Sequence, residues 1–371
     1  MDKIGLIPSA GMYGVLEVFI QQLAEGLREL PGVATAVFSL EKPPKQFFAD
    51  IEAFKPDCLV VFNSLFAAEN GALFCDYLKI PTLFYLVDAP FHFSDPASPY
   101  AATACIDRGH TRDLAAKGFT KTLFLPHAVD KADHRTPQKI TKYGCVMLST
   151  GINFRERYAK MLGALPPALI QRVQEAFEKY ETDALLTLDE ALGPEDPFPV
   201  PRALLLKEMD LYLKGKKRME FLQGLKGIQI DLFGGGDGWS EILGNTCPHV
   251  RIHPGLDYPA ALEVMGDAAV VLSHCSSIKD GAHERLFAAI SQGAEAATYT
   301  NPYLKENFQK GEGLILGQTI EELGKEIEFA LNNPDKRVES ILKGQEKIAQ
   351  AHLWKHRGAI LQQSLKSFFG Q

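Results

Sequence analysis

Four ionisable side chains, Asp280, His283, Glu284 and Arg285, crowd into one short turn of the chain. A guanidinium can bind phosphate oxygens through two parallel hydrogen bonds, so this set of groups suits a phosphate-containing ligand. The alternative is ordinary helix capping, with Asp280 as the N-cap and Glu284 in the first turn. An arginine among acids is better explained by a ligand than by capping alone.

The turn lies between an apolar run and a helical pattern. Residues 268–272 are all apolar, which predicts a buried parallel strand. From about residue 282 the apolar positions follow helical spacing, until Gly293 ends the pattern. In open α/β sheets ligands bind where strands end, and the start of a helix offers unpaired N–H groups. We therefore expect a binding site for a phosphate at this turn.

A glycine-rich run follows the predicted strand 227–233. Gly235 and Gly236 would let a ligand approach the backbone closely, although a simple turn explains them equally well. The dinucleotide-binding fingerprint needs a glycine where Trp239 stands, and no clear amphipathic helix follows at once. NAD binding is therefore not expected.

Polar side chains follow two further predicted strands in this half of the chain. Arg155 comes after strand 143–148 and could hold a phosphate; the alternative is a surface ion pair with Glu156. His253 and Tyr258 lie at and after the end of strand 250–253. If the sheet is parallel, these strand ends share one edge, so together they are a stronger signal than any one alone.

The first half carries comparable side chains after its own predicted strands. Gly11 lies in the turn after strand 3–7 and would admit a ligand, or serve a plain turn. Asp88 and His92 follow the strand that begins at residue 82, and His127 follows strand 121–125. A carboxylate or imidazole at such a place can act as general base on a hydroxyl, although a lone histidine is more often structural.

Strands and helices alternate along the chain, which predicts an α/β protein with two doubly wound parallel sheets. We expect an N-terminal domain of residues 1–135, a second domain of residues 136–345 and a C-terminal segment of residues 346–371. Residues 158–225 are predicted to form a helical excursion in the second domain, with a proline-rich break at 192–201.

Composition argues against several functions. The net charge of −7 gives no general basic surface for nucleic acid or an anionic membrane. No apolar run approaches the ~20 residues of a membrane span, and the N-terminus does not resemble a signal peptide. The six cysteines show no CxxC spacing and the ten histidines no HExxH motif. Reduced core cysteines, no metal site and a cytoplasmic location are expected.

Four motifs follow one another in this half of the chain: Phe233-Gly234-Gly235-Gly236, His253-Pro254-Gly255-Leu256-Asp257-Tyr258, Asp280-Gly281-Ala282-His283-Glu284-Arg285 and Asn301-Pro302-Tyr303-Leu304. In this order they resemble the motifs of the CgeB-like glycosyltransferase family. The likeness continues in His352-Leu353-Trp354 and covers roughly residues 143–360. The first domain matches mainly in architecture and in Val87-Asp88-Ala89-Pro90.

The resemblance implies a GT-B fold, in which two Rossmann-like domains face each other across a cleft and the last helix crosses back to the first domain. It implies a nucleotide-sugar donor held mainly by the second domain and an acceptor held mainly by the first. Related enzymes often carry two acids eight positions apart at the donor loop. Here Asp280 stands at the first position but Ala288 at the second, so Glu284 or Glu263 would have to replace the missing acid.

We therefore expect a glycosyltransferase that moves a sugar from a nucleotide-sugar donor to an acceptor hydroxyl, with no bound metal or cofactor. Arg285 and Arg155 would neutralise the leaving diphosphate, and Trp239 or Tyr258 would stack on the base. Asp88, His92 or His127 would activate the acceptor. The expected donor-binding residues are Gly11, Arg155, Gly235, Gly236, Trp239, His253, Tyr258, Asp280, His283, Glu284 and Arg285.

Two alternatives stay open. One is a catalytically inactive GT-B-like protein that binds a nucleotide sugar or a protein partner, and the other is a nucleotide-sugar epimerase or hydrolase. The sequence does not separate UDP-, GDP-, CMP- and dTDP-sugars, nor a glycan, lipid or protein acceptor. The 158–225 segment could bind an acceptor, join two subunits in a homo-oligomer, or serve only as additional structure in the domain.

Overall fold

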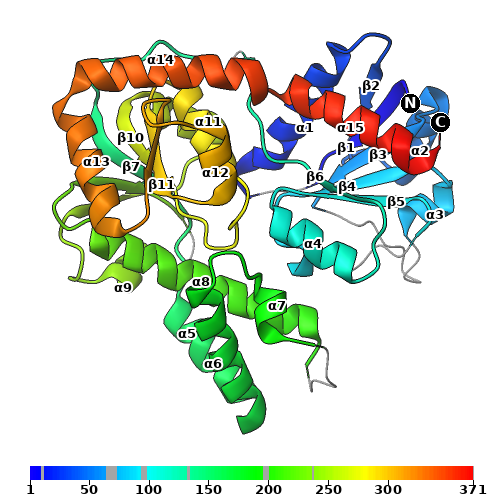
Figure 1. Cartoon of the computed structure of the whole chain (residues 1–371). Helices are drawn as coiled ribbons and strands as arrows, with labels where there is room; N and C mark the ends of the chain where they lie inside the picture. The colour runs from blue at the N-terminus through cyan, green and yellow to red at the C-terminus, as the bar shows by residue number, and fades with distance from the viewer. Residues whose placement is uncertain are drawn as a thin grey trace. The chain divides into compact units, whose positions relative to one another are not determined.

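The computed structural model describes residues 1–370, apart from 10–11, 64–72, 93–97, 132–133, 195–199 and 236–237, and it describes only the backbone of Met12 and His92. The chain divides into two compact units. The first unit comprises Met1–Asp130 and Ala351–Gln371, and the second comprises Lys131–Gln350. Each unit is built on one six-stranded sheet with helices around it (Figure 1).

The sheet of the first unit has the strand order β2-β1-β3-β4-β5-β6, and its described pairings are all parallel. Its strands are β1 (Lys3–Ile7), β2 (Ala34–Val37), β3 (Cys58–Phe62), β4 (Thr82–Leu86), β5 (Ala101–Cys105) and β6 (Thr122–Phe124). Its helices are η1 (Met12–Gly14), α1 (Val15–Arg28), α2 (Pro44–Phe54), α3 (Phe74–Leu78), η2 (Pro90–His92), α4 (Arg108–Ala116) and α15 (Trp354–Phe369). The apolar run of β3 is buried at every residue, as a central parallel strand requires.

The last helix, α15, completes this unit by packing along α1 (Figure 1). The Trp354 side chain is 1% exposed, and its indole N–H donates to Gln22 Oε1 at 2.9 Å. The buried Arg357 guanidinium donates to the carbonyls of Pro126 and His127, which follow β6. The C-terminal residues therefore supply both core and hydrogen bonds to a sheet formed by the beginning of the chain.

The second sheet has the order β12-β11-β10-β7-β8-β9, again with parallel pairings throughout its described strands. Its strands are β7 (Tyr143–Leu148), β8 (Ile230–Phe233), β9 (Val250–His253), β10 (Ala268–Leu272), β11 (Glu295–Tyr299) and β12 (Leu314–Gly317). The strand order reverses between β7 and β10, which is the topological switch point where ligands bind in such sheets. Its flanking helices are α9 (Trp239–Leu243), α10 (Tyr258–Gly266), α11 (Glu284–Ser291), α12 (Pro302–Asn307), α13 (Ile320–Asn332) and α14 (Pro334–Ala351).

Four more helices, inserted between β7 and β8, form a group beside this sheet (Figure 1). They are α5 (Phe154–Ala164), α6 (Pro167–Thr182), α7 (Leu188–Leu192) and α8 (Arg202–Gly224). The predicted helical excursion is thus confirmed over its described residues; most of its proline-rich break, 195–199, lies outside them. Gly215 of α8 fits closely against Ile152, since a Cβ there would lie 2.8 Å from the Ile152 carbonyl oxygen.

The sequence prediction missed two short elements of the second unit. The helix α9 begins directly at Trp239, where no helix was expected, and the edge strand β12 was not recognised. β12 has only four residues, and glycines stand at Gly313 and Gly317, so its strand signal is weak. Among the described residues, no helix is both long and apolar enough to cross a membrane.

We predict that Gly26→Ala will destabilise the first unit. A Cβ at Gly26 would lie 2.6 Å from the Lys355 backbone nitrogen, so α1 and α15 would have to separate. The expected loss in free energy of unfolding is about 1–3 kcal/mol, measured by urea denaturation. Gly358→Ala is the matched control in the same helix pair, because its Cβ would meet the movable Leu27 side chain at 3.1 Å. An equal loss in both variants would contradict this account.

Candidate functional site

A pocket of about 600 Å³ lies at the carboxyl ends of β10 and β11. The loop 273–283, which follows β10, lines it together with residues 298–305, which lead from β11 into α12. The end of α6 and Lys217 of α8 complete the lining. All of these residues belong to the second unit, so the pocket is formed within that unit alone.

Three polar side-chain atoms of this lining are buried without a hydrogen-bond partner among the residues that the structure describes. They are His274 Nε2, Ser276 Oγ and Thr300 Oγ1. An unsatisfied buried polar atom costs about 1–3 kcal/mol, and native proteins keep few of them. Their position on the pocket lining makes these three atoms candidate partners for the hydrogen-bonding groups of a ligand.

The imidazole of His274 is fixed by aromatic rings. It stacks on Phe221 with ring centroids 5.4 Å apart, and the Tyr299 ring meets it edge-on at 5.3 Å. Burial, together with the positive charges of Arg218 and Lys217, lowers the pKa of His274 to about 3. The ring is therefore neutral at pH 7, with one ring nitrogen able to accept a hydrogen bond and the other to donate one.

The loop 273–283 is held from two sides. On one side Asn301 Nδ2 donates to the Gly281 carbonyl at 2.9 Å, while Asn301 Oδ1 caps α12 by accepting from Leu304 N. On the other side, the loop bonds to the end of α6 through Tyr180 and Lys279. The sequence prediction included this stretch but did not single out Lys279, nor His274 and Thr300 on its flanks.

The predicted cluster at the start of α11 is only partly at the pocket. His283 lines it, whereas Asp280, Glu284 and Arg285 do not. The Nδ1 atom of His283 contacts the Glu284 carboxylate, and Arg285 Nε lies 3.7 Å from Glu284 Oε1. Burial lowers the pKa of His283, with a further lowering from Arg285 that Glu284 opposes.

The alternative interpretation of this turn, with Asp280 as the N-cap, is wrong. His283, not Asp280, is the N-cap, and its side chain accepts from Arg285 N. Asp280 is 8% exposed and lies before the helix.

The prediction that Trp239 stacks on a base is also wrong. Its side chain is 3% exposed, and its indole N–H donates to the Ser149 carbonyl at 2.8 Å. Gly234 packs against the same carbonyl, since a Cβ there would lie 1.9 Å from it. The Gly235 carbonyl accepts from Gly151 N at 2.8 Å. The described part of the glycine-rich run thus serves close packing of two loops, and Gly236 lies outside the described residues.

Three other predicted donor residues lie elsewhere in the second unit. His253 ends the edge strand β9, where Nε2 lies 2.6 Å from Asp231 Oδ1 and the ring stacks on Phe233 at 4.4 Å. Tyr258 is 6% exposed at the start of α10. Arg155 is exposed on α5, and the suggested ion pair of Glu156 is made instead with Lys160. None of the three lines the pocket.

In the first unit the predicted acceptor residues differ in exposure. Asp88 is exposed, and its Oδ2 accepts from Asn63 Nδ2 at 2.9 Å. Asn63 has the left-handed conformation (φ 45°), which asparagine tolerates, and also accepts from Val87 N. His127 is 2% exposed beside Phe19, which argues against its predicted role as a base. Gly11 and the side chain of His92 lie outside the description.

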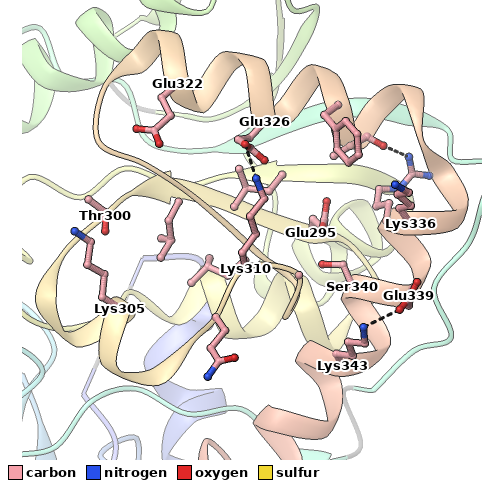
Figure 2. Close-up of a pocket in the computed structure, with 18 of the residues that line it drawn as sticks. Glu295, Thr300, Lys305, Lys310, Glu322, Glu326, Lys336, Glu339, Ser340 and Lys343 are labelled. Carbon is pink, nitrogen blue, oxygen red and sulfur yellow. Dashed lines mark hydrogen bonds and ion pairs between the residues drawn. The ribbon is translucent and has the colours of Figure 1, made fainter.

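A second pocket, of about 640 Å³, runs along the edge strand β12 and is shown in Figure 2. Two of its lysines are paired with carboxylates. Lys310 Nζ lies 2.7 Å from Glu326 Oε1, and Lys343 Nζ lies 2.7 Å from Glu339 Oε1. This pocket flanks a strand instead of following strand ends, and its paired charges make it the weaker candidate for a phosphate.

Comparison with known proteins agrees with this architecture. Residues 216–363, from within α8 to within α15, match the family model described as glycosyl transferase-like. Curated proteins gave no match in sequence. The match covers the pocket-lining loop and agrees with the predicted enzyme class, a glycosyltransferase.

Solved structures share the fold over the whole chain. Anabaena HepE in complex with UDP is 14% identical, with 99% of this chain and 100% of that chain covered and a TM-score of 0.54. Sucrose-phosphate synthase from Thermosynechococcus elongatus is 12% identical, with both chains fully covered and a TM-score of 0.56. AviGT4, a glycosyltransferase involved in avilamycin A biosynthesis, is 14% identical, with 100% and 99% covered and a TM-score of 0.54. The predicted GT-B fold is confirmed.

We predict that His274 makes the second unit sensitive to acid. The folded-state pKa of about 3 lies below the ordinary 6.5, so unfolding takes up a proton between these values and stability is lost as pH falls through them. In urea titrations from pH 6 to pH 4, His274→Phe should reduce the pH slope of the unfolding free energy by about 1.4 kcal/mol per pH unit. Part of the pH dependence that remains in this variant will come from His283, whose pKa is also lowered. If the unfolding free energy depends on pH equally in wild type and His274→Phe, the low pKa of His274 is contradicted.

Proposed function

We propose that the chain transfers a sugar from a nucleotide-sugar donor to an acceptor hydroxyl, and that the sugar occupies the pocket at the ends of β10 and β11. The observation that carries this proposal is the set of three unsatisfied polar atoms in that pocket, on His274, Ser276 and Thr300. Sugar hydroxyls both donate and accept hydrogen bonds, so they can partner an imidazole and two hydroxyl groups at once.

The same region offers positive charge for a diphosphate. Lys305 lines the pocket from α12, and the structure gives it no ion pair with any described residue. The start of α11 adds the positive end of a helix dipole beside His283, and Arg285 lies two positions further along the chain. We keep Arg285 as the proposed group that neutralises the leaving nucleoside diphosphate.

On the acceptor side we propose Asp88. It is an exposed carboxylate at the end of β4, held by Asn63, and a carboxylate can orient or deprotonate an acceptor hydroxyl. Metal-independent transfer stays part of the proposal, as does a cytoplasmic location, which the six free cysteines favour. Membership of the CgeB-like subfamily is likewise proposed, on the motifs around Asp280 and Asn301.

One observation favours a second candidate function, a nucleotide-sugar-binding protein without turnover. Ala288, where related enzymes carry a second acid, is fully buried in α11, so its side chain has no access to a ligand. Release of free nucleotide in the presence of acceptor mixtures distinguishes the two functions, because only a transferase produces it at a rate that depends on acceptor.

The donor class can be found with a thermal-shift screen of the full chain against UDP, GDP, CMP and dTDP and their common sugar conjugates. UDP and UDP-glucose are the first pair to test, because UDP is present in the HepE structure. A ligand at about a hundred times its Kd stabilises the folded protein by about 2.7 kcal/mol, which raises the melting temperature. A shift with one nucleotide that is lost in Arg285→Ala supports the proposal, and no shift with any of them refutes it.

Thr300→Val provides a sharper prediction. The Thr300 hydroxyl has no partner among the described residues, so replacing it should leave the stability of the free protein unchanged or slightly higher. Donor binding should weaken by about 1–3 kcal/mol, measured by calorimetry, because the sugar loses a partner.

Thr246→Val is the matched control for this prediction. Its hydroxyl donates to the Leu243 carbonyl at 2.6 Å, outside the pocket. This variant should lose about 1 kcal/mol of stability and keep its affinity for the donor. Unchanged donor affinity in Thr300→Val would place the sugar elsewhere.

A further inference from the structure

The helical group α5–α8 contributes to the pocket directly. Tyr180, Glu181, Asp183 and Ala184, at and just beyond the end of α6, line it together with Lys217 of α8. A group of helices inserted between β7 and β8 therefore forms one wall of a pocket whose other walls come from the sheet's own loops.

Two side chains join this wall to the loop 273–283 in opposite directions. From the loop, Lys279 Nζ donates to the carbonyls of Tyr180 and Asp183 at 2.5 and 2.7 Å. From the helix, the Tyr180 hydroxyl donates to the Ser276 carbonyl. The Lys279 ammonium also lies 3.5 Å from the centroid of the Tyr180 ring. We call these contacts the Tyr180–Lys279 clasp.

The clasp uses the electrostatics of a helix end. Carbonyls in the last turn of α6 have no intrahelical partner and carry partial negative charge, which an ammonium group satisfies. The Tyr180 ring face adds attraction for the same cation. Tyr180 is 6% exposed, so little water competes for these contacts.

We propose that the helical group α5–α8 is a specificity element of the donor site, and that Tyr180 and Lys279 are positioning residues that set the shape of the sugar pocket. This inference rests on the proposed function, because it takes the pocket to hold the donor's sugar. The clasp fixes the 276–279 side of the loop, next to Ser276, while Asn301 fixes Gly281 on the other side. Without the clasp, the 276–279 side of the loop loses these contacts with the end of α6.

The experiment compares wild type with Lys279→Met, which removes the ammonium but keeps an unbranched stem, and with Lys279→Arg, which restores a cation and donors. Lys310→Met is the control, since it removes an exposed lysine paired with Glu326 away from this pocket. Calorimetry measures Kd for UDP and UDP-glucose, or for the pair that the screen selects. Hydrogen exchange of the same proteins without ligand measures protection of residues 273–283.

We expect Lys279→Met to weaken UDP-glucose binding by about tenfold, equivalent to about 1.4 kcal/mol, and to change UDP binding by less than about twofold. Amide exchange should accelerate within 273–283 and stay unchanged in β7 and β8. Lys279→Arg should recover most of the affinity, and Lys310→Met should match wild type.

Three results would overturn the inference. Wild-type affinity for UDP-glucose in Lys279→Met would show that the clasp does not shape the pocket. An equal loss for UDP and UDP-glucose, with faster exchange throughout the second unit, would show a general stabilising role. If wild type binds neither nucleotides nor nucleotide sugars, the proposed function itself fails, and the inference fails with it.

Discussion

Parallel strand pairing is the constraint on which the rest of the structure depends. Two strands can run parallel only if the chain returns to the starting edge between them, so every connection passes over a face of the sheet. The loops after the strands consequently gather at one edge, together with the first turns of the helices that follow. In the second unit, this places the loop 273–283 and the segment after β11 beside each other, and the pocket lies between them.

Much of the fold could be predicted because a buried parallel strand appears in the sequence as a continuous apolar run. The strands predicted at 143–148 and 268–272 became β7 and β10 with unchanged bounds. β12 was not predicted, because its four residues beside glycines are too short a segment to show a clear strand pattern. Trp239 was misinterpreted because an aromatic residue after glycines suits both a ligand and a tight packing of loops, and only its bond to Ser149 decides between them.

The site was harder to predict because the best evidence for it is a set of buried polar atoms that lack hydrogen-bond partners among the described residues. That the Thr300 hydroxyl and His274 Nε2 lack hydrogen-bond partners among the described residues becomes visible only when their neighbours are in place. The link between Tyr180 and Lys279 joins residues 99 positions apart, beyond the reach of local patterns. By contrast, His283 could be predicted, because it stands where a strand signal gives way to a helix signal.

The division of the chain also has a consequence for its synthesis. The first unit is interrupted after Asp130 and completed only by residues from Ala351 onward. Trp354, which fills the space beside α1, therefore leaves the ribosome after all of the second unit. The second unit can fold while the first still lacks one helix and exposes the apolar surface of α1. During that interval the first unit, although it was made first, exposes apolar surface of the kind that favours aggregation.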